Sequence, residues 1–186
     1  MPLNVPILLT WARILMIPAI VGVFYLPEDW VSRSECNLFA TILFVTAAIT
    51  DLLDGYLARR LNQTSAFGAF LDPVADKLMV AAALILLVEL RRADALIAFI
   101  IIGREIAVSA LREWMAQLGH SKSVAVNLLG KVKTVSQMVA IPMLLYQDPL
   151  GAFLPAQWGT WLIWIAAGLT VASMFYYLKL ASLPPH

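Results

Sequence analysis

Residues 51–77 of this 186-residue chain read DLLDGYLARRLNQTSAFGAFLDPVADK, which places four aspartates close together in an otherwise apolar sequence. Hydrophobic residues make up 61% of the chain, and its mean hydropathy is +0.83. A soluble domain is closer to half apolar, so the excess indicates a membrane protein. Because a charge at the centre of a spanning helix costs about 2.5–3.5 kcal/mol on insertion scales, we expect these four carboxylates to have a function.

Six apolar stretches run along the chain, each near the length of about 20 residues that a membrane-spanning helix needs. They are residues 5–25, 38–57, 72–90, 95–118, 126–146 and 158–178. Arg13 interrupts the first stretch and no small-residue cleavage site follows, so this stretch is expected to be a membrane helix rather than a signal peptide. We therefore expect an all-α, polytopic membrane protein of six transmembrane helices, organised as a single domain over residues 1–186.

The distribution of positive charge predicts how the helices are oriented. Threading six spans from a cytoplasmic N-terminus places most basic residues on the cytoplasmic side, as the positive-inside rule requires. The cytoplasmic set is Arg13, Arg59, Arg60, Lys77, Arg104, Arg112, Lys122, Lys131, Lys133 and Lys179, and the opposite set is Arg33, Arg91 and Arg92. Both termini and the 51–77 segment are then cytoplasmic. The net charge of +1 gives no indication of a nucleic-acid partner.

The spacing of the four aspartates predicts that they meet. Asp51 and Asp54 are three residues apart at the end of the second stretch. Asp72 and Asp76 are four residues apart at the start of the third stretch. Each spacing puts both carboxylates on one face of a helix, and the polar loop between the stretches makes the two helices antiparallel neighbours. Asp72 and Pro73 are also typical of a helix start, with aspartate as N-cap and proline as the first helical residue.

Four carboxylates that meet repel one another unless cations neutralise them. Hard divalent cations such as Mg²⁺ or Mn²⁺ prefer oxygen ligands, and two such ions about 3.5–4 Å apart are the usual arrangement for displacement at phosphorus. Gly55, Ala58 and Gly68 lack bulk and leave room for a phosphate or nucleotide, while Arg59 can donate two hydrogen bonds to a phosphate. The segment thus predicts a metal-dependent site for a phosphate-containing ligand.

The same residues fill the pattern D-x2-D-G-x2-A-R-x8-G-x3-D-x3-D without a gap. This pattern resembles the signature of the CDP-alcohol phosphatidyltransferases, which are six-helix integral membrane enzymes with the motif on the second and third helices, usually homodimers. The resemblance covers most of the chain. The other stretches that carry it are NVPILLTWARILMIP at 4–18, FGAFLDPVADKLMV at 67–80, GREIAVSALREWMA at 103–116 and GKVKTVSQMVA at 130–140.

The resemblance implies transfer of a phosphatidyl group from CDP-diacylglycerol to an alcohol, with release of CMP. Over the whole chain the likeness points to bacterial members whose acceptor is sn-glycerol 3-phosphate, and hence to a bacterial inner membrane, contact with membrane lipids and a homodimer. It also implies that two Mg²⁺ or Mn²⁺ ions are bound, with Asp76 as the candidate base. The implied metal ligands are Asp51, Asp54, Asp72 and Asp76, and the implied CDP-diacylglycerol site is Gly55, Ala58, Arg59 and Gly68.

Two polar residues of the first stretch, Thr10 and Arg13, are expected to complete the CDP-diacylglycerol site. They are three residues apart near the predicted inner end of the helix and so lie on one face. From there they would close the nucleotide site from a third side. A polar helix start at the membrane interface is the alternative reading of both residues.

Basic residues of the fourth and fifth stretches predict a site for an acceptor phosphate. Arg104 and Arg112 are eight residues apart, about two helical turns, and so share a face. Lys131 and Lys133 open the fifth stretch. Four extra cations favour a phosphorylated acceptor, but inositol phosphate would meet the same requirement, so a sibling enzyme with that acceptor stays open. Pairing of the arginines with neighbouring glutamates such as Glu105 is the structural alternative.

Two further classes of protein could also place aspartates in a membrane. A divalent-cation transporter would need acidic residues along a path to both faces, whereas all four aspartates lie near one predicted end of the helices. A structural membrane protein would use the charges only to pair with each other. The spacing on both sides of one loop favours the enzyme.

Overall fold

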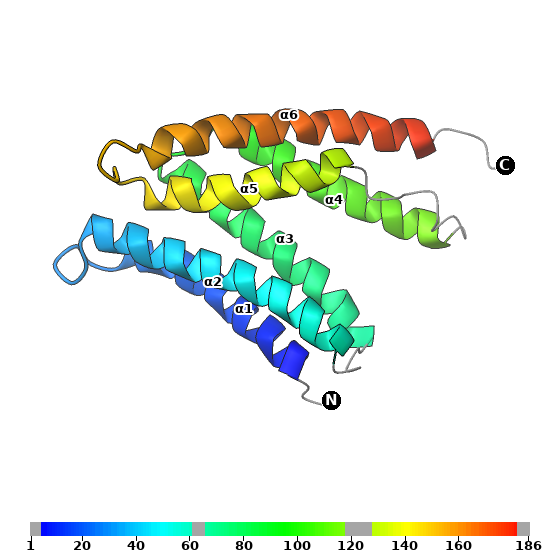
Figure 1. The fold of residues 1–186 in the computed structure, drawn as a ribbon, viewed down its shortest axis with the longest axis horizontal. Helices are drawn as coiled ribbons and strands as arrows, with labels where there is room; N and C mark the ends of the chain where they lie inside the picture. The colour runs from blue at the N-terminus through cyan, green and yellow to red at the C-terminus, as the bar shows by residue number, and fades with distance from the viewer. Residues whose placement is uncertain (1–4, 61–65, 118–127, 182–186) are drawn as a thin grey trace.

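The computed structural model describes residues 5–60, 66–117 and 128–181, and Figure 1 shows its arrangement. Within these ranges the chain is helical, apart from short connections and one isolated β-bridge between Leu150 and Phe153. The helices are α1 Val5–Gly22, α2 Arg33–Arg60, α3 Ala66–Glu89, α4 Ala95–Gln117, α5 Leu128–Tyr146 and α6 Pro155–Ala181, with a 3₁₀ turn η1 at Val23–Tyr25. The predictions of an all-α fold and of six helices are confirmed.

The predicted helix start at Asp72 is wrong. α3 begins at Ala66, so Asp72 and Pro73 lie inside the helix. The residues before Asp72 are apolar and continue the helix, because a helix satisfies backbone groups that an apolar environment leaves without water. Pro73 lacks one backbone N–H donor, and the residues on both sides of it remain helical. Asp72 and Asp76 therefore both lie within α3.

A capping box starts α2 earlier than the apolar pattern predicts. The Ser32 hydroxyl oxygen accepts a hydrogen bond from the Glu35 backbone N–H at 3.4 Å, and a Glu35 carboxylate oxygen accepts one from the Ser32 N–H at 2.8 Å. The Ser32 hydroxyl also donates to this carboxylate, and these hydrogen bonds hold the pKa of Glu35 below its usual value. The spacing Ser-x-x-Glu at 32–35 is the signal that locates this helix start.

The helices pack as two pairs, which meet directly where α2 packs against α5 and are also connected by α3. α1 packs against α2, α5 packs against α6, and α4 packs against α3 and α6. Figure 1 shows α3 running diagonally between the α1–α2 pair and the helices that follow it. The buried core draws on all six of these helices, with Phe44, Met79, Ile101 and Ile141 among its fully buried side chains. The motif helices therefore meet the later helices mainly in two places, where α2 packs against α5 and where α3 packs against α4.

Two helices contain a segment long and apolar enough to cross a membrane, among the residues that the structure describes. These segments are Ile7–Tyr25 and Pro155–Phe175, and a shorter apolar segment covers Val132–Tyr146. α3 and α4 carry charged side chains within their lengths, which shortens their apolar segments. α1 begins and α6 ends at the same end of the bundle, as an even number of crossings requires (Figure 1). Six spans and cytoplasmic termini stay predictions.

Arg92 ties together the end of the bundle that is opposite the start of α1. It follows α3, where its backbone N–H bonds the Leu87 carbonyl at 2.8 Å in the manner of a Schellman motif. Its guanidinium donates to the Leu145 carbonyl near the end of α5 at 2.7 Å and to Asn37 Oδ1 on α2 at 2.7 Å. Asn37 in turn donates to Asp148, after α5, at 3.3 Å. Arg92 thus connects three helices, α3 through its backbone and α2 and α5 through its side chain.

The α5–α6 pair approaches closely at Gly159. A Cβ at this position would lie 2.9 Å from Leu144 Cγ and 3.1 Å from Met143 Cβ. Leu144 is buried, and Met143 Cβ is attached directly to the backbone, so neither atom can move without shifting α5. Glycine at this position is therefore a packing requirement.

We expect Gly159→Ala to destabilise the protein by about 1–3 kcal/mol, because the added methyl group overpacks the α5–α6 contact. Gly168→Ala, on the same helix, is the matched control, since a Cβ there meets nothing within 4 Å. The control should be neutral or slightly stabilising, because alanine is the better helix former. The thermal unfolding midpoint of the detergent-purified variants measures both effects, and equal midpoints for the two variants would contradict the packing argument.

Candidate active site

Two side chains of α1 bind two of the predicted metal ligands directly. The Thr10 hydroxyl donates to Asp72 Oδ1 at 2.6 Å, and Arg13 Nη1 donates to Asp51 Oδ1 at 2.5 Å in an ion pair. Arg13 is 0% exposed, and Thr10 is buried as well. The shared face predicted for these two residues is confirmed, and it is turned toward the aspartates of α2 and α3. α1 therefore lies against the aspartates of α2 and α3, and its role in closing a nucleotide site stays a prediction.

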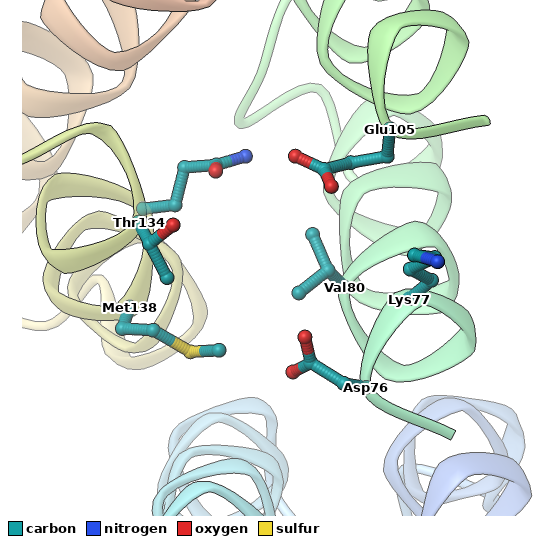
Figure 2. Close-up of a pocket in the computed structure, with 7 residues that line it drawn as sticks. Asp76, Lys77, Val80, Glu105, Thr134 and Met138 are labelled. Carbon is teal, nitrogen blue, oxygen red and sulfur yellow. The ribbon is translucent and has the colours of Figure 1, made fainter. Parts of the chain in front are cut away.

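Asp76, one turn beyond Asp72 on α3, points into a cavity between α3, α4 and α5 (Figure 2). Its Oδ1 atom is buried and has no hydrogen-bond partner. The charged groups close enough to act on it electrostatically are Asp51, Arg13, Lys77 and Lys133. Asp76 is thus within electrostatic reach of both the motif aspartates and one of the predicted acceptor cations.

The described aspartates suit a hard divalent ion, although they do not by themselves form a ready cluster. Among the side chains that the structure places, no three acidic, histidine or cysteine residues are arranged to hold a metal. The side chain of Asp54, the fourth predicted ligand, lies outside them. The α1 hydrogen bonds engage Oδ1 of Asp51 and Oδ1 of Asp72, and the buried Oδ1 of Asp76 lacks a partner. Carboxylate oxygens, one of them orphaned, fit Mg²⁺ or Mn²⁺.

Several predicted site residues cannot be placed at the level of the side chain. Gly68 lies in the first turn of α3 and is partly buried. The side chains that fall outside the described part of the chain are those of Asp54, Gly55, Ala58, Arg59, Arg112 and Lys131. Their predicted roles stay predictions.

Two of the predicted acceptor cations meet at one carboxylate. Lys133 Nζ donates to Glu105 Oε1, and Arg104 Nη1 lies 3.4 Å from the same oxygen. Arg104 Nη2 donates to Ser173 Oγ on α6 at 3.0 Å. Both cations are buried, Lys133 with 2% of its surface exposed. The cations therefore converge, and the pairing with Glu105 that the sequence left open as an alternative is present too.

The cavity lies between Asp76 and Glu105, the carboxylate that this cation pair contacts. Its walls are Asp76, Lys77 and Val80 from α3, Glu105 from α4, and Thr134, Gln137 and Met138 from α5. In Figure 2 the carboxylates of Asp76 and Glu105 lie at its two ends, with Val80 between them. The sequence did not single out Thr134 or Gln137. For Gln137 the signal was its spacing from Lys133, because it follows by one helical turn on the same face. Thr134 directly follows Lys133, so the same spacing does not identify it.

The chain belongs to the CDP-alcohol phosphatidyltransferase family, whose sequence model matches residues 3–172. It is 48% identical over 187 residues to the "CDP-diacylglycerol--glycerol-3-phosphate 3-phosphatidyltransferase" of Salmonella choleraesuis (strain SC-B67), across 97% of this chain and 96% of that protein. The proteins of the same name from Escherichia coli (strain K12) and Shigella flexneri serotype 5b (strain 8401) give the same identity and coverage. The resemblance seen in the sequence is confirmed at the level of the family.

We expect Glu105→Gln to lower the thermal unfolding midpoint, because it removes the charged carboxylate that both buried cations, Lys133 and Arg104, contact. Lys133→Met should destabilise less, since Arg104 still balances Glu105. Loss of a charged hydrogen bond of this kind costs about 1–3 kcal/mol. The double variant should regain part of the loss, because removing both partners is milder than removing one. If the destabilisation of the double variant equals the sum of the two single effects, Glu105 and Lys133 do not interact.

Proposed function

We propose that the chain transfers the phosphatidyl group of CDP-diacylglycerol to sn-glycerol 3-phosphate, which gives phosphatidylglycerophosphate and CMP. The observation that carries the proposal is 48% identity, over 97% of the chain, to relatives named for this transfer. The geometry supports it independently. Aspartates of α2 and α3 and buried cations of α4 and α5 lie around one region, and a diphosphate donor and a phosphorylated acceptor need these two kinds of group.

The donor would bind where α1, α2 and α3 meet, with two Mg²⁺ or Mn²⁺ ions held by Asp51, Asp54, Asp72 and Asp76. When bound, the ions neutralise charge on the diphosphate and on the departing CMP. Thr10 and Arg13 orient two of these carboxylates through the hydrogen bonds described above. The residues proposed to line the CDP-diacylglycerol site are Thr10, Arg13, Gly55, Ala58, Arg59 and Gly68.

In the transfer, a hydroxyl oxygen of the acceptor attacks the phosphorus that carries diacylglycerol. The bond from this phosphorus to the oxygen of CMP breaks, and the hydroxyl proton passes to a base. Asp76 is our candidate for the base, because its Oδ1 is buried, lacks a partner and belongs to a residue of the cavity wall. A carboxylate in hydrogen-bond reach of the reacting hydroxyl contributes about 10²–10⁴-fold to such a step.

The acceptor phosphate would bind to Arg104 and Lys133, together with Arg112 and Lys131. Glu105 keeps the first two cations in place before the acceptor arrives. A phosphate dianion can accept hydrogen bonds from both, so it would replace Glu105 as their partner. An acceptor without a phosphate would leave Glu105 in place and gain little from these residues.

The protein would work in the inner membrane of a bacterium, as a homodimer with its active site facing the cytoplasm. The apolar helices and the large exposed apolar side chains, such as Leu15, Phe99 and Phe175, support a position in a lipid bilayer. The excess of basic residues at the predicted inner end supports the orientation. Diacylglycerol chains could then stay in the bilayer while the CDP group reaches the aspartates.

Release of CMP by the purified protein tests the proposed function. With CDP-diacylglycerol and Mg²⁺ or Mn²⁺, we expect release with sn-glycerol 3-phosphate and little with serine, inositol phosphate or no acceptor. EDTA should abolish release, and either ion added in excess should restore it. Release with inositol phosphate alone would identify the sibling enzyme, and no release with any acceptor would contradict a transferase.

We expect Asp76→Asn to lower kcat by about 100-fold or more, because the amide cannot accept the hydroxyl proton. Asp29→Asn, in the exposed connection before α2, is the control and should keep full activity. Titration of Mn²⁺ into both variants, followed by its paramagnetic resonance signal, separates loss of the base from loss of metal. An Asp76→Asn protein that binds Mn²⁺ and turns over normally would exclude Asp76 as the base.

A further inference from the structure

Gln137 on α5 is a buried polar side chain whose amide nitrogen has no hydrogen-bond partner. Only 3% of the residue is exposed, and its Nε2 atom is buried. Buried polar groups in native proteins are nearly always paired, so an orphaned donor of this kind indicates a missing partner. Gln137 also forms part of the wall of the cavity between α3, α4 and α5, together with Asp76. The missing partner is therefore expected in that cavity.

The side chains in and beside this cavity offer a ligand a cation, a neutral hydrogen-bond donor, an acceptor and apolar contacts. Lys133, which supplies a cation, and Gln137, which supplies a neutral donor, are four residues apart and so lie one turn apart on the same face of α5. Across the cavity, α3 supplies Asp76, whose buried Oδ1 accepts no hydrogen bond. The wall also contains the apolar side chains of Val80 and Met138 and the polar side chains of Lys77, Glu105 and Thr134. Lys133 is not itself a wall residue and contacts the wall through Glu105. A ligand that satisfies all of these groups needs an anion, a neutral acceptor, a donor and a short carbon chain.

We propose that Gln137 binds the acceptor by donating its amide N–H to the free secondary hydroxyl of sn-glycerol 3-phosphate. This inference rests on the proposed function. With the phosphate on Lys133 and Arg104 and the primary hydroxyl toward Asp76, the secondary hydroxyl falls between them, beside Gln137. Its oxygen supplies the partner that the amide nitrogen lacks. Gln137 thereby distinguishes glycerol phosphate from acceptors without a hydroxyl at this carbon.

The wild-type protein gives the first test, through a pair of acceptors that differ by one oxygen. 3-Hydroxypropyl phosphate keeps the phosphate and the primary hydroxyl of glycerol 3-phosphate and lacks the secondary hydroxyl. Because this analogue leaves a buried donor unpaired, we expect kcat/KM to be about 10- to 100-fold lower than for sn-glycerol 3-phosphate. Equal kcat/KM values for the two acceptors would overturn the inference without any variant.

Gln137→Met gives the second test, because methionine keeps the length of the side chain and removes the donor. It should lower kcat/KM for sn-glycerol 3-phosphate by about 10- to 100-fold and leave the analogue nearly unchanged, so that the preference falls below about threefold. Met138→Leu, in the same wall without a change of polarity, should keep the wild-type preference. The KM for CDP-diacylglycerol and the unfolding midpoint of Gln137→Met report whether the variant is otherwise intact.

The outcomes separate this inference from the function on which it rests. A Gln137→Met protein that keeps the wild-type preference overturns the inference and leaves the proposed function standing. A wild-type protein that releases CMP with neither acceptor overturns both. A preference that is present in the wild type and in Met138→Leu, and lost in Gln137→Met, supports the inference, because a merely structural glutamine would change turnover of the two acceptors alike.

Discussion

The ion pair between Arg13 and Asp51 is the interaction on which the arrangement of the first three helices depends. A guanidinium with no exposed surface is costly in an apolar bundle unless a carboxylate neutralises it and accepts its hydrogen bond. Arg13 therefore holds α1 against α2 at the depth of the motif. The hydrogen bond from Thr10 to Asp72 repeats this attachment on α3. The same two contacts that fix α1 also fix the orientation of the carboxylates, so fold and site are built from the same atoms.

Paired charges also occur between α4 and α5, and two buried polar atoms without a hydrogen-bond partner indicate where a ligand would bind. Glu105 accepts Lys133 and approaches Arg104, so that these buried charges balance one another locally. In contrast, Asp76 and Gln137 each keep one buried polar atom without a partner, and both belong to the same cavity wall. A native structure keeps such atoms where a ligand completes the set. The unsatisfied donor and acceptor therefore mark this cavity as the place where a ligand would supply the missing partners.

The sequence was most informative where periodicity and spacing carry the information. The spacing of the aspartates and the shared face of Thr10 and Arg13 follow from helical geometry alone. The start of α3 was missed because Asp-Pro is typical of a helix start, whereas the apolar residues before it continue the helix. Gln137 was missed for a different reason. Whether a polar side chain in an apolar helix has a partner depends on its tertiary neighbours, which spacing does not contain. The Asp54 and Arg59 predictions still rest on the motif.

The attachment made by Arg92 has a consequence for access to the site. It joins α2, the end of α3 and the last turn of α5 at the end of the bundle remote from the aspartates. Near the aspartates, Arg13 and Thr10 attach α2 and α3 to α1, so both motif helices are held near each of their ends. A two-tailed lipid that reaches the aspartates would therefore have to pass between helices that these contacts do not join.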